Sequence, residues 1–134
     1  MPNRVSWEPG FSVGHAVIDA QHQALLSQCH VLADHCGGAG GEQAERSFDQ
    51  AFEQLKVLAR QHFETEASLL AACDYPDLED HRIDCDEFEY LADEIATTAN
   101  FDRLELQRFI ALWCVGHIVG SAGQRAFLAE GAAG

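Results

Sequence analysis

The spacing of the apolar residues is the feature that most limits how this chain can fold. In four long segments with few β-branched residues, apolar side chains recur at intervals of three and four, the repeat of a helix that buries one face. Glycine-rich residues 37–41, the turn-forming residues 74–77 and a weaker break near 97–102 separate these segments. The pattern predicts helices at roughly 18–36, 42–73, 77–98 and 102–129.

Short connections between helices make sequential neighbours antiparallel. We therefore expect an all-α, up-down-up-down antiparallel four-helix bundle, preceded by an N-terminal arm that contains Trp7, Pro9 and Phe11. A length of 134 residues suits one domain, and 47% hydrophobic residues are enough to build a core. Residues 1–134 are expected to form a single metal-binding domain, for the reason given next.

Each predicted helix carries potential metal ligands within its apolar stripe. These are His22 in the first helix, His62 and Glu66 in the second, His81 and Cys85 in the third, and His117 in the fourth. The two pairs are each four residues apart, so their side chains stack on one helical face and can reach one ion or two adjacent ions. A single histidine in a core is commonly a hydrogen-bonded structural residue, but so many buried polar groups would be costly without a shared partner. The pattern predicts a metal site, and the off-stripe histidines are expected in loops or at the surface: His15, His30 and His35.

The ligand types narrow the choice of metal. Imidazole and carboxylate suit iron, zinc, manganese or copper, and a thiolate favours iron or zinc. Four-helix bundles are an established frame for di-metal carboxylate centres. The chain lacks the paired Glu-x-x-His motifs of ferritin-like di-iron proteins and has His-x-x-x-Glu at residues 62–66 instead.

Several short motifs follow one another in order along nearly the whole chain. They are Trp7 in the arm, the run Val13–His22, the segment His62–Glu66, Tyr75-Pro76 ahead of His81, Phe88 three residues after Cys85, and Trp113 four before His117. Together they resemble the bacterial branch of the hemerythrin family. The resemblance implies a four-helix bundle with two iron ions that binds O2 reversibly or senses it. It also implies that His22 and His62 hold one metal, that His81, residue 85 and His117 hold the other, and that Glu66 bridges them.

The chain departs from that family's pattern at two ligand positions. Cys85 stands where the pattern has a histidine, and Ala122 stands where it has a second bridging aspartate. The site could be in decay, or a shifted register of the last helix could let Ser121 or Gln124 supply an oxygen. The third interpretation is a functional centre with altered ligands. Loss of the aspartate removes one anionic ligand and a Cys85 thiolate adds one, so the number of anionic protein ligands stays the same. Four mixed ligands on the His81 side would then hold a tetrahedral zinc or a mononuclear iron with an open position.

Charge and cysteine content exclude some classes of partner. Eight basic and 22 acidic residues give a formal net charge of -14, which disfavours binding to nucleic acid or to anionic membranes. The chain begins without an apolar run and has no stretch of about 18 apolar residues, so a cytoplasmic location is expected. The five cysteines are odd in number and form no Cys-x-x-Cys pair, which favours free thiols over a disulfide framework.

These observations favour a non-haem metal protein that binds or senses O2, NO or a related small ligand. Iron is the expected metal, as a di-iron centre by the resemblance, with mononuclear iron or zinc as alternatives. The output of a sensor would pass through a homodimer contact or a separate signalling partner. Whether the protein is an enzyme stays open: a thiolate-ligated iron could reduce a reactive oxygen or nitrogen species. The third hypothesis is a closed zinc or redox-regulated thiol site, in which Cys29 and Cys114 lie near Cys85.

Overall fold

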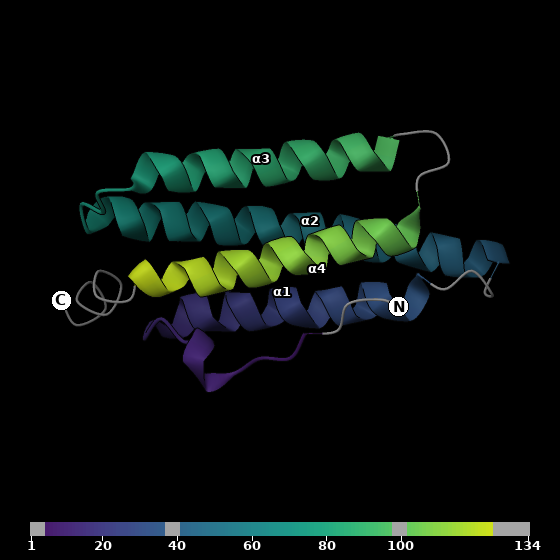
Figure 1. Cartoon of the computed structure of the whole chain (residues 1–134), viewed down its shortest axis with the longest axis horizontal. Coiled ribbons are helices and arrows are strands. Elements are labelled where there is room, and N and C mark those ends of the chain that lie inside the picture. Colours follow the sequence, from purple (N-terminus) through teal and green to yellow (C-terminus); the bar gives the residue numbers. More distant parts are fainter. Residues whose placement is uncertain (1–4, 37–40, 98–101, 125–134) are drawn as a thin grey trace.

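The structure is a computed structural model, and it describes residues 5–36, 41–97 and 102–124. Within these residues there are four α-helices, α1 (Ala16–His35), α2 (Gly41–Ala72), α3 (Leu78–Thr97) and α4 (Arg103–Gly120), and two 3-10 turns, η1 (Pro9–Phe11) and η3 (Ser121–Gln124). Each helix runs antiparallel to the one before it (Figure 1), and contacts join α1 to α2, α2 to α3, α3 to α4 and α4 back to α1. The predicted all-α antiparallel four-helix bundle is confirmed.

The first three helices begin and end within two residues of their predicted limits, but the prediction for the last helix was wrong. The α-helix ends at Gly120, and residues 121–124 form the tighter 3-10 turn; residues 125–129 lie outside the described part of the chain. Two local features explain the change. The hydroxyl of Ser121 donates to the carbonyl of His117 at 2.8 Å. Glycines at 116, 120 and 123 also lower the helix propensity of this stretch.

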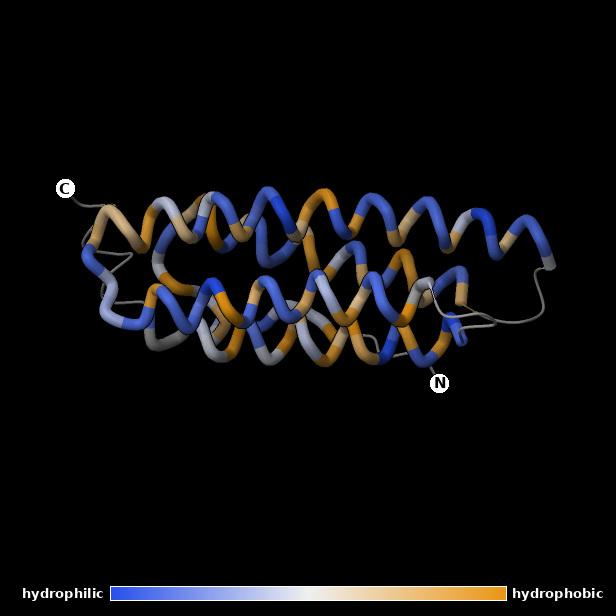
Figure 2. Tube along the Cα trace, turned by 90° about the horizontal axis from the view of Figure 1, so that it is seen from above, coloured by the Kyte–Doolittle hydropathy of each residue, from blue (hydrophilic) through white to orange (hydrophobic). Residues whose placement is uncertain are grey.

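The apolar stripes meet along the bundle axis and form the core. Hydrophobic positions recur along each helix between hydrophilic ones (Figure 2), as the three-and-four spacing predicts. Leu25, Phe48, Leu55, Phe88 and Ile110 are each at most 1% exposed. Three residues beyond Glu66, the stripe spacing predicts Leu69 as the next buried position of α2, but the fully buried residue there is Leu70 and Leu69 is only partly buried.

The N-terminal arm packs against the bundle. The rings of Trp7 and Phe11 meet edge to face at 5.6 Å and lie against the main core. A half-buried ring nitrogen of His30 lies 2.8 Å from the carbonyl oxygen of Val5. Both His30 and His35 lie within α1 and are half-buried, which corrects the expectation that they lie in loops or at the surface. His15 is the N-cap of α1, and its Nδ1 accepts from the amide of Ile18.

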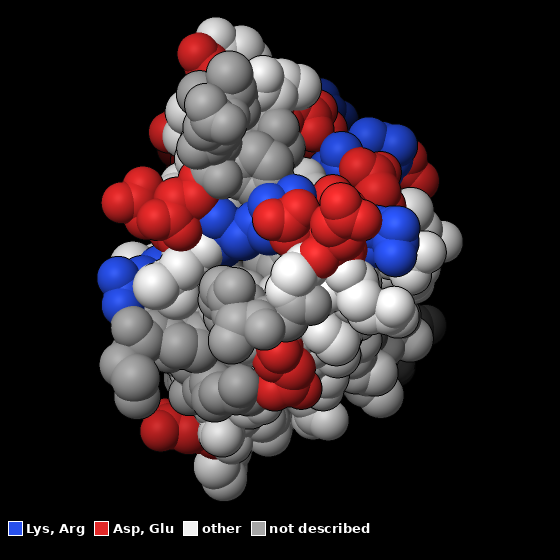
Figure 3. Space-filling view, turned by 90° about the vertical axis from the view of Figure 1, so that its right-hand side faces the viewer, with Lys and Arg blue, Asp and Glu red and all other residues white. Residues whose placement is uncertain are grey.

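Basic side chains lie beside acidic ones at the end of the bundle shown in Figure 3. Three ion pairs tie α2 to its neighbours: Lys56–Asp93 at 3.2 Å, Arg60–Glu89 at 3.3 Å and Arg103–Asp49 at 3.2 Å. Lys56, Arg60 and Arg103, which belong to the eight basic residues of the chain, are thus paired with carboxylates. Among the helices that the structure describes, none is both long and apolar enough to cross a membrane.

Candidate metal centre

The centre is built around the carboxylate of Glu66, which is fully buried on α2. Its Oε2 atom lies 2.9 Å from Nε2 of His62 and 3.4 Å from Nε2 of His22. Its Oε1 atom lies 3.2 Å from Nε2 of His117 and also contacts Nε2 of His81. One oxygen therefore faces the two histidines of α1 and α2, and the other faces the two histidines of α3 and α4. The sequence-predicted set of four histidines and one glutamate is brought together.

Helix register explains the convergence. His62 and Glu66 are four residues apart on α2, so their side chains lie one above the other on its inner face. The other three helices each place one histidine at the same level, near the start of α1, the start of α3 and the end of α4. His22 and His62 are 0% exposed and His81 is 7% exposed, so little solvent reaches these groups.

A hydrogen-bonded chain fixes the tautomer of His62. The hydroxyl of Thr65 donates to the carbonyl of Gln61 at 2.8 Å, so its oxygen is left to accept from Nε2 of Gln21 at 3.2 Å. The amide oxygen of Gln21 then faces His62 and accepts from its Nδ1 at 2.8 Å. In neutral His62 the other nitrogen, Nε2, therefore carries a lone pair that points into the centre.

The charges of the centre follow from burial and from the crowding of the rings. Burial lowers the pKa of His62 from 6.5 to about 4, and the neighbouring His117 and His22 act in the same direction against the attraction of Glu66. Burial alone would raise the pKa of Glu66, but the four imidazole rings packed around its carboxylate, those of His117, His22, His62 and His81, hold that pKa well below its usual range. At neutral pH the centre thus contains an ionised carboxylate beside a neutral imidazole.

The residues present fit a bound cation. The 2.9 Å contact between Nε2 of His62 and Oε2 of Glu66 joins two acceptors, and Nε2 of His117 lies 3.2 Å from Nε2 of His62. Among the described residues, both ring nitrogens of His22, Oε2 of Glu66 and Nδ1 of His81 are buried without a hydrogen-bond partner. Ligand atoms of His22, His62, Glu66 and His117 all lie within 4.8 Å of one another. A shared cation would bind one ring nitrogen of each histidine together with Glu66, which supplies the partner that these buried acceptors need, while the other nitrogen of each neutral ring keeps its proton.

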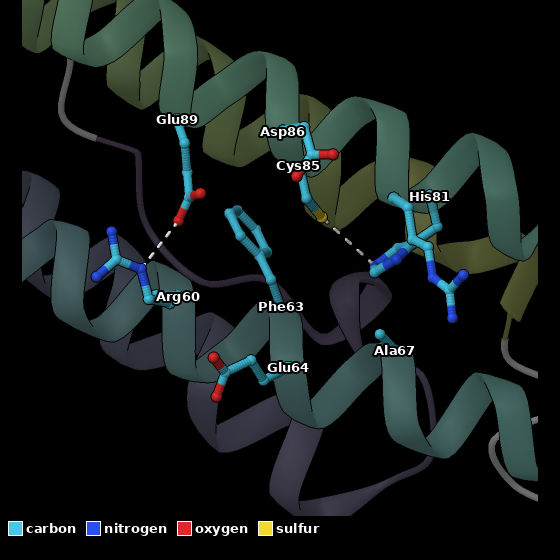
Figure 4. A pocket seen from close by; sticks show the side chains of 9 residues that line it. Arg60, Phe63, Glu64, Ala67, His81, Cys85, Asp86 and Glu89 are labelled. Carbon is cyan, nitrogen blue, oxygen red and sulfur yellow. Dashed lines mark hydrogen bonds and ion pairs between the residues drawn. The ribbon is translucent and has the colours of Figure 1, made fainter.

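Cys85 lies beside this group and outside its tightest part. Its Sγ is 3.8 Å from Nε2 of His81, and Figure 4 shows the sulfur directed toward that ring. Zinc–sulfur and zinc–nitrogen bonds of about 2.3 and 2.1 Å place two tetrahedral ligands about 3.6 Å apart, close to the observed spacing. Burial raises the pKa of the Cys85 thiol above its usual range, and the charges of Glu66, Asp84, Asp86 and Glu89 raise it further. The thiol is protonated on its own, so a metal would have to displace its proton.

A cavity of about 400 Å³ reaches Cys85 and His81 from the surface between α2 and α3 (Figure 4). Phe63, Ala67 and Cys85 contribute apolar surface to it. The ion pair of Arg60 with Glu89, at 3.3 Å, lies on its wall. The cavity can admit a small molecule to the His81 side of the centre.

Two further residues position the histidines. The Trp113 ring stacks on His117, with 4.9 Å between centroids and 11° between planes. Trp113 was among the motif residues noted in the sequence. The role of Gln21 was missed, because Gln21 lies beside the apolar stripe and its partner His62 is 41 residues away. Only the pairing of α1 with α2 brings that amide to His62.

The region of the absent aspartate is described in part. The side chain at position 122 lies outside the described residues, and alanine offers no ligand atom. Of the two replacements considered, Ser121 uses its hydroxyl on the carbonyl of His117. Gln124 is 5% exposed, and its Oε1 has no hydrogen-bond partner among the residues described.

Comparison with known proteins gives one match. A family model described as the hemerythrin HHE cation binding domain matches residues 13–120, which contain the centre and all four helices. No curated protein and no solved structure matches the chain in the other two comparisons.

Proposed function

Because the chain belongs to the hemerythrin HHE cation-binding domain family, we propose that its buried centre holds non-haem iron and binds or senses O2, NO or a related small ligand. The observation that carries the proposal is the position of Glu66, whose two oxygens each face a different pair of histidines. A carboxylate so placed suits a bridge between two ions. His22 and His62 would hold one ion, and His81 and His117 would hold the other.

Cys85 is proposed as a further ligand on the His81 side. Its distance from Nε2 of His81 supports a shared ion, and its anionic form would offset the carboxylate that Ala122 does not provide. A cation lowers the pKa of a coordinating thiol, which overcomes the effect of burial and of the acidic neighbours. Bound iron would supply the electrons that small oxygen or nitrogen ligands accept. The protein's own residues would hold the metal, exclude water from the Oε2 side of Glu66, where His22 and His62 are 0% exposed, and leave the Cys85 side accessible.

The cavity over Cys85 favours a second candidate function. A thiolate ligand pushes electron density onto iron, which favours redox chemistry over reversible binding. Because Cys85 and His81 line a cavity open to the surface, a small reactive oxygen or nitrogen species could reach that position and be reduced there. A closed zinc site is the third candidate; two other buried thiols lie near each other, since Cys29 raises the pKa of Cys114.

Metal analysis and an absorption spectrum on protein prepared without oxygen test the proposal. We expect iron near two ions per chain and a spectral change on adding O2 or NO. Stoichiometric zinc in a colourless protein would rule out both iron functions. Turnover of peroxide, superoxide or NO that is lost in Cys85→Ser would favour the enzyme over the sensor.

Glu66→Gln tests the bridging role directly. The change keeps the shape of the side chain and removes the charge between the four histidines. We expect metal affinity to fall by more than the ~10–100-fold that loss of an outer hydrogen-bond partner costs. Glu64→Gln is the matched control, because Glu64 is exposed on the same helix two residues away. Equal metal binding by the two variants would contradict the proposed bridge.

A further inference from the structure

A second cavity, of about 250 Å³, reaches the centre between the start of α3 and the end of α4. His81 and His117 line its inner part, so it adjoins the Oε1 side of Glu66. This volume is far above the roughly 10–15 Å³ that one water needs, so the cavity can hold a partly hydrated ion. It differs from the cavity over Cys85 in the charge of the side chains that line it.

Carboxylates at the N-terminal end of α3 line this second cavity: Asp77 directly precedes the helix, and Asp80 and Asp84 lie on it. Asp77, Asp80 and Asp84 contribute to its wall, and they follow one another at intervals of three and four. Among the described residues that line it, there is no lysine or arginine, whereas Arg60 and Arg82 line the other cavity. A cleft lined by one sign of charge focuses the field and raises the local concentration of the opposite ion. The second cavity is therefore attractive to cations.

A buried oxygen points to a ligand independently of this charge. Gln124 lines the same cavity and is 5% exposed, yet its Oε1 has no hydrogen-bond partner among the described residues. Buried amide oxygens are normally satisfied, and a neutral oxygen of this kind suits a hard cation. On the α4 wall, Gly116 and Gly120 leave room, since a Cβ added at either would meet nothing within 4 Å.

We propose that this cavity is the path by which a divalent cation reaches the centre, with Asp80 and Asp84 attracting the ion at its wall and the amide oxygen of Gln124 binding it before transfer to His81 and His117. The inference rests on the proposed function, because it needs a metal-binding centre to deliver the ion to. It assigns a role to Gln124 that does not depend on which metal the mature protein holds.

The rate of metal uptake tests the path. Co²⁺ added to metal-free protein in a stopped-flow instrument reports uptake through the absorption of the histidine-ligated ion. In Asp80→Asn/Asp84→Asn we expect the association rate constant to fall about tenfold at low ionic strength. The final amount of bound Co²⁺ should match that of the unmodified protein. The difference should shrink strongly toward 1 M salt, where the screening length is about 3 Å.

The control removes the same charge from the same helix elsewhere. Asp86→Asn/Glu87→Gln also deletes two negative charges from α3, and Asp86 lines the cavity over Cys85. We expect its uptake rate to stay within about twofold of the unmodified protein. Equal slowing of both double variants would show an effect of net charge alone and would overturn the proposal. Slowing of the control only would assign entry to the Cys85 cavity and would overturn it as well.

Gln124→Leu separates the oxygen from the charge. We expect slower uptake that persists at high salt, because the lost group is neutral. Unchanged uptake in Gln124→Leu and in the Asp80/Asp84 double variant, with normal Co²⁺ binding at equilibrium, would refute the path and leave the proposed function standing. If the unmodified protein took up no Co²⁺ and no Fe²⁺, the proposed function itself would fail, and the path with it.

Discussion

Replacement of Gln21 by leucine should weaken metal binding without touching a metal ligand. Gln21 accepts from Nδ1 of His62 at 2.8 Å and thereby directs the Nε2 lone pair toward Glu66. Leucine keeps most of the volume but leaves a buried N–H unpartnered, which costs about 1–3 kcal/mol. His62 is then free to adopt the other tautomer, in which Nε2 carries the proton and cannot bind metal. Loss of such an outer partner lowers metal affinity about 10–100-fold, or about 1.4–2.8 kcal/mol, in agreement with the hydrogen-bond figure.

A competition titration against a chromophoric chelator measures the affinity of Gln21→Leu. Gln21→Glu is the matched control, since a carboxylate keeps the acceptor and should hold or raise the affinity. Thr65→Val removes the partner of the Gln21 amide nitrogen, together with the Thr65 hydrogen bond to the carbonyl of Gln61, and should have a smaller effect than Gln21→Leu. If Gln21→Leu bound metal as tightly as the unmodified protein, the inferred tautomer of His62 and its role in the centre would be wrong.

Three further outcomes are expected. In iron-loaded Cys85→Ser, a long-wavelength thiolate-to-iron absorption band should disappear; an unchanged spectrum and iron content would show that Cys85 is not a ligand. Phe88→Ala should lower the free energy of unfolding in urea by about 3–5 kcal/mol, since the ring is 1% exposed and lies 4.3 Å from that of Trp113. Tyr90→Ala, at a 66% exposed position of the same helix, should change it by under about 0.5 kcal/mol, and similar losses in both would contradict the packing. The metal-free protein should lose stability as the pH falls from 6.5 toward 4, by up to about 3 kcal/mol, because the unfolded chain protonates His62 near 6.5 and the fold only at about 4. Urea unfolding at several pH values checks this, and constant stability across that range would speak against a buried neutral His62.

The fold could be predicted because apolar spacing and breaks act locally. The glycine-rich connection and the turn before Leu78 separate helices whose limits were found within two residues. The end of α4 could not be predicted in the same way, since the apolar pattern continues past Gly120 while a hydroxyl and three glycines tighten the chain. Hydrogen bonds from serine side chains to backbone carbonyls are hard to predict from sequence, because serine also occurs within helices.

The members of the centre could be predicted, but their mutual orientation could not. A histidine within an apolar stripe must face the core, which places His22 and His117 near each other without any knowledge of distances. The division of the Glu66 oxygens between two histidine pairs depends on the helices' relative rotation and depth. The same holds for Gln21, which lies off the predicted ligand pattern and acquires its role only when α1 and α2 meet. Gln124 was named from the sequence as a possible oxygen donor, but its place in one cavity with His81 and His117 could not be predicted.

The two halves of the centre differ most in their access to the surface. His22 and His62, on the Oε2 side of Glu66, match the pattern of the family that the sequence resembles and are 0% exposed. Neither lines the cavity over Cys85 or the acidic cavity, whereas His81 lines both. Cys85, the proposed ligand that stands where the family's pattern has a histidine, lies on that same, accessible side. Exchange of ions and small ligands with solvent should therefore occur at the His81 half. The cysteine at position 85 thus changes the solvent-accessible half of the centre, whereas the buried half with His22 and His62 keeps the family's pattern.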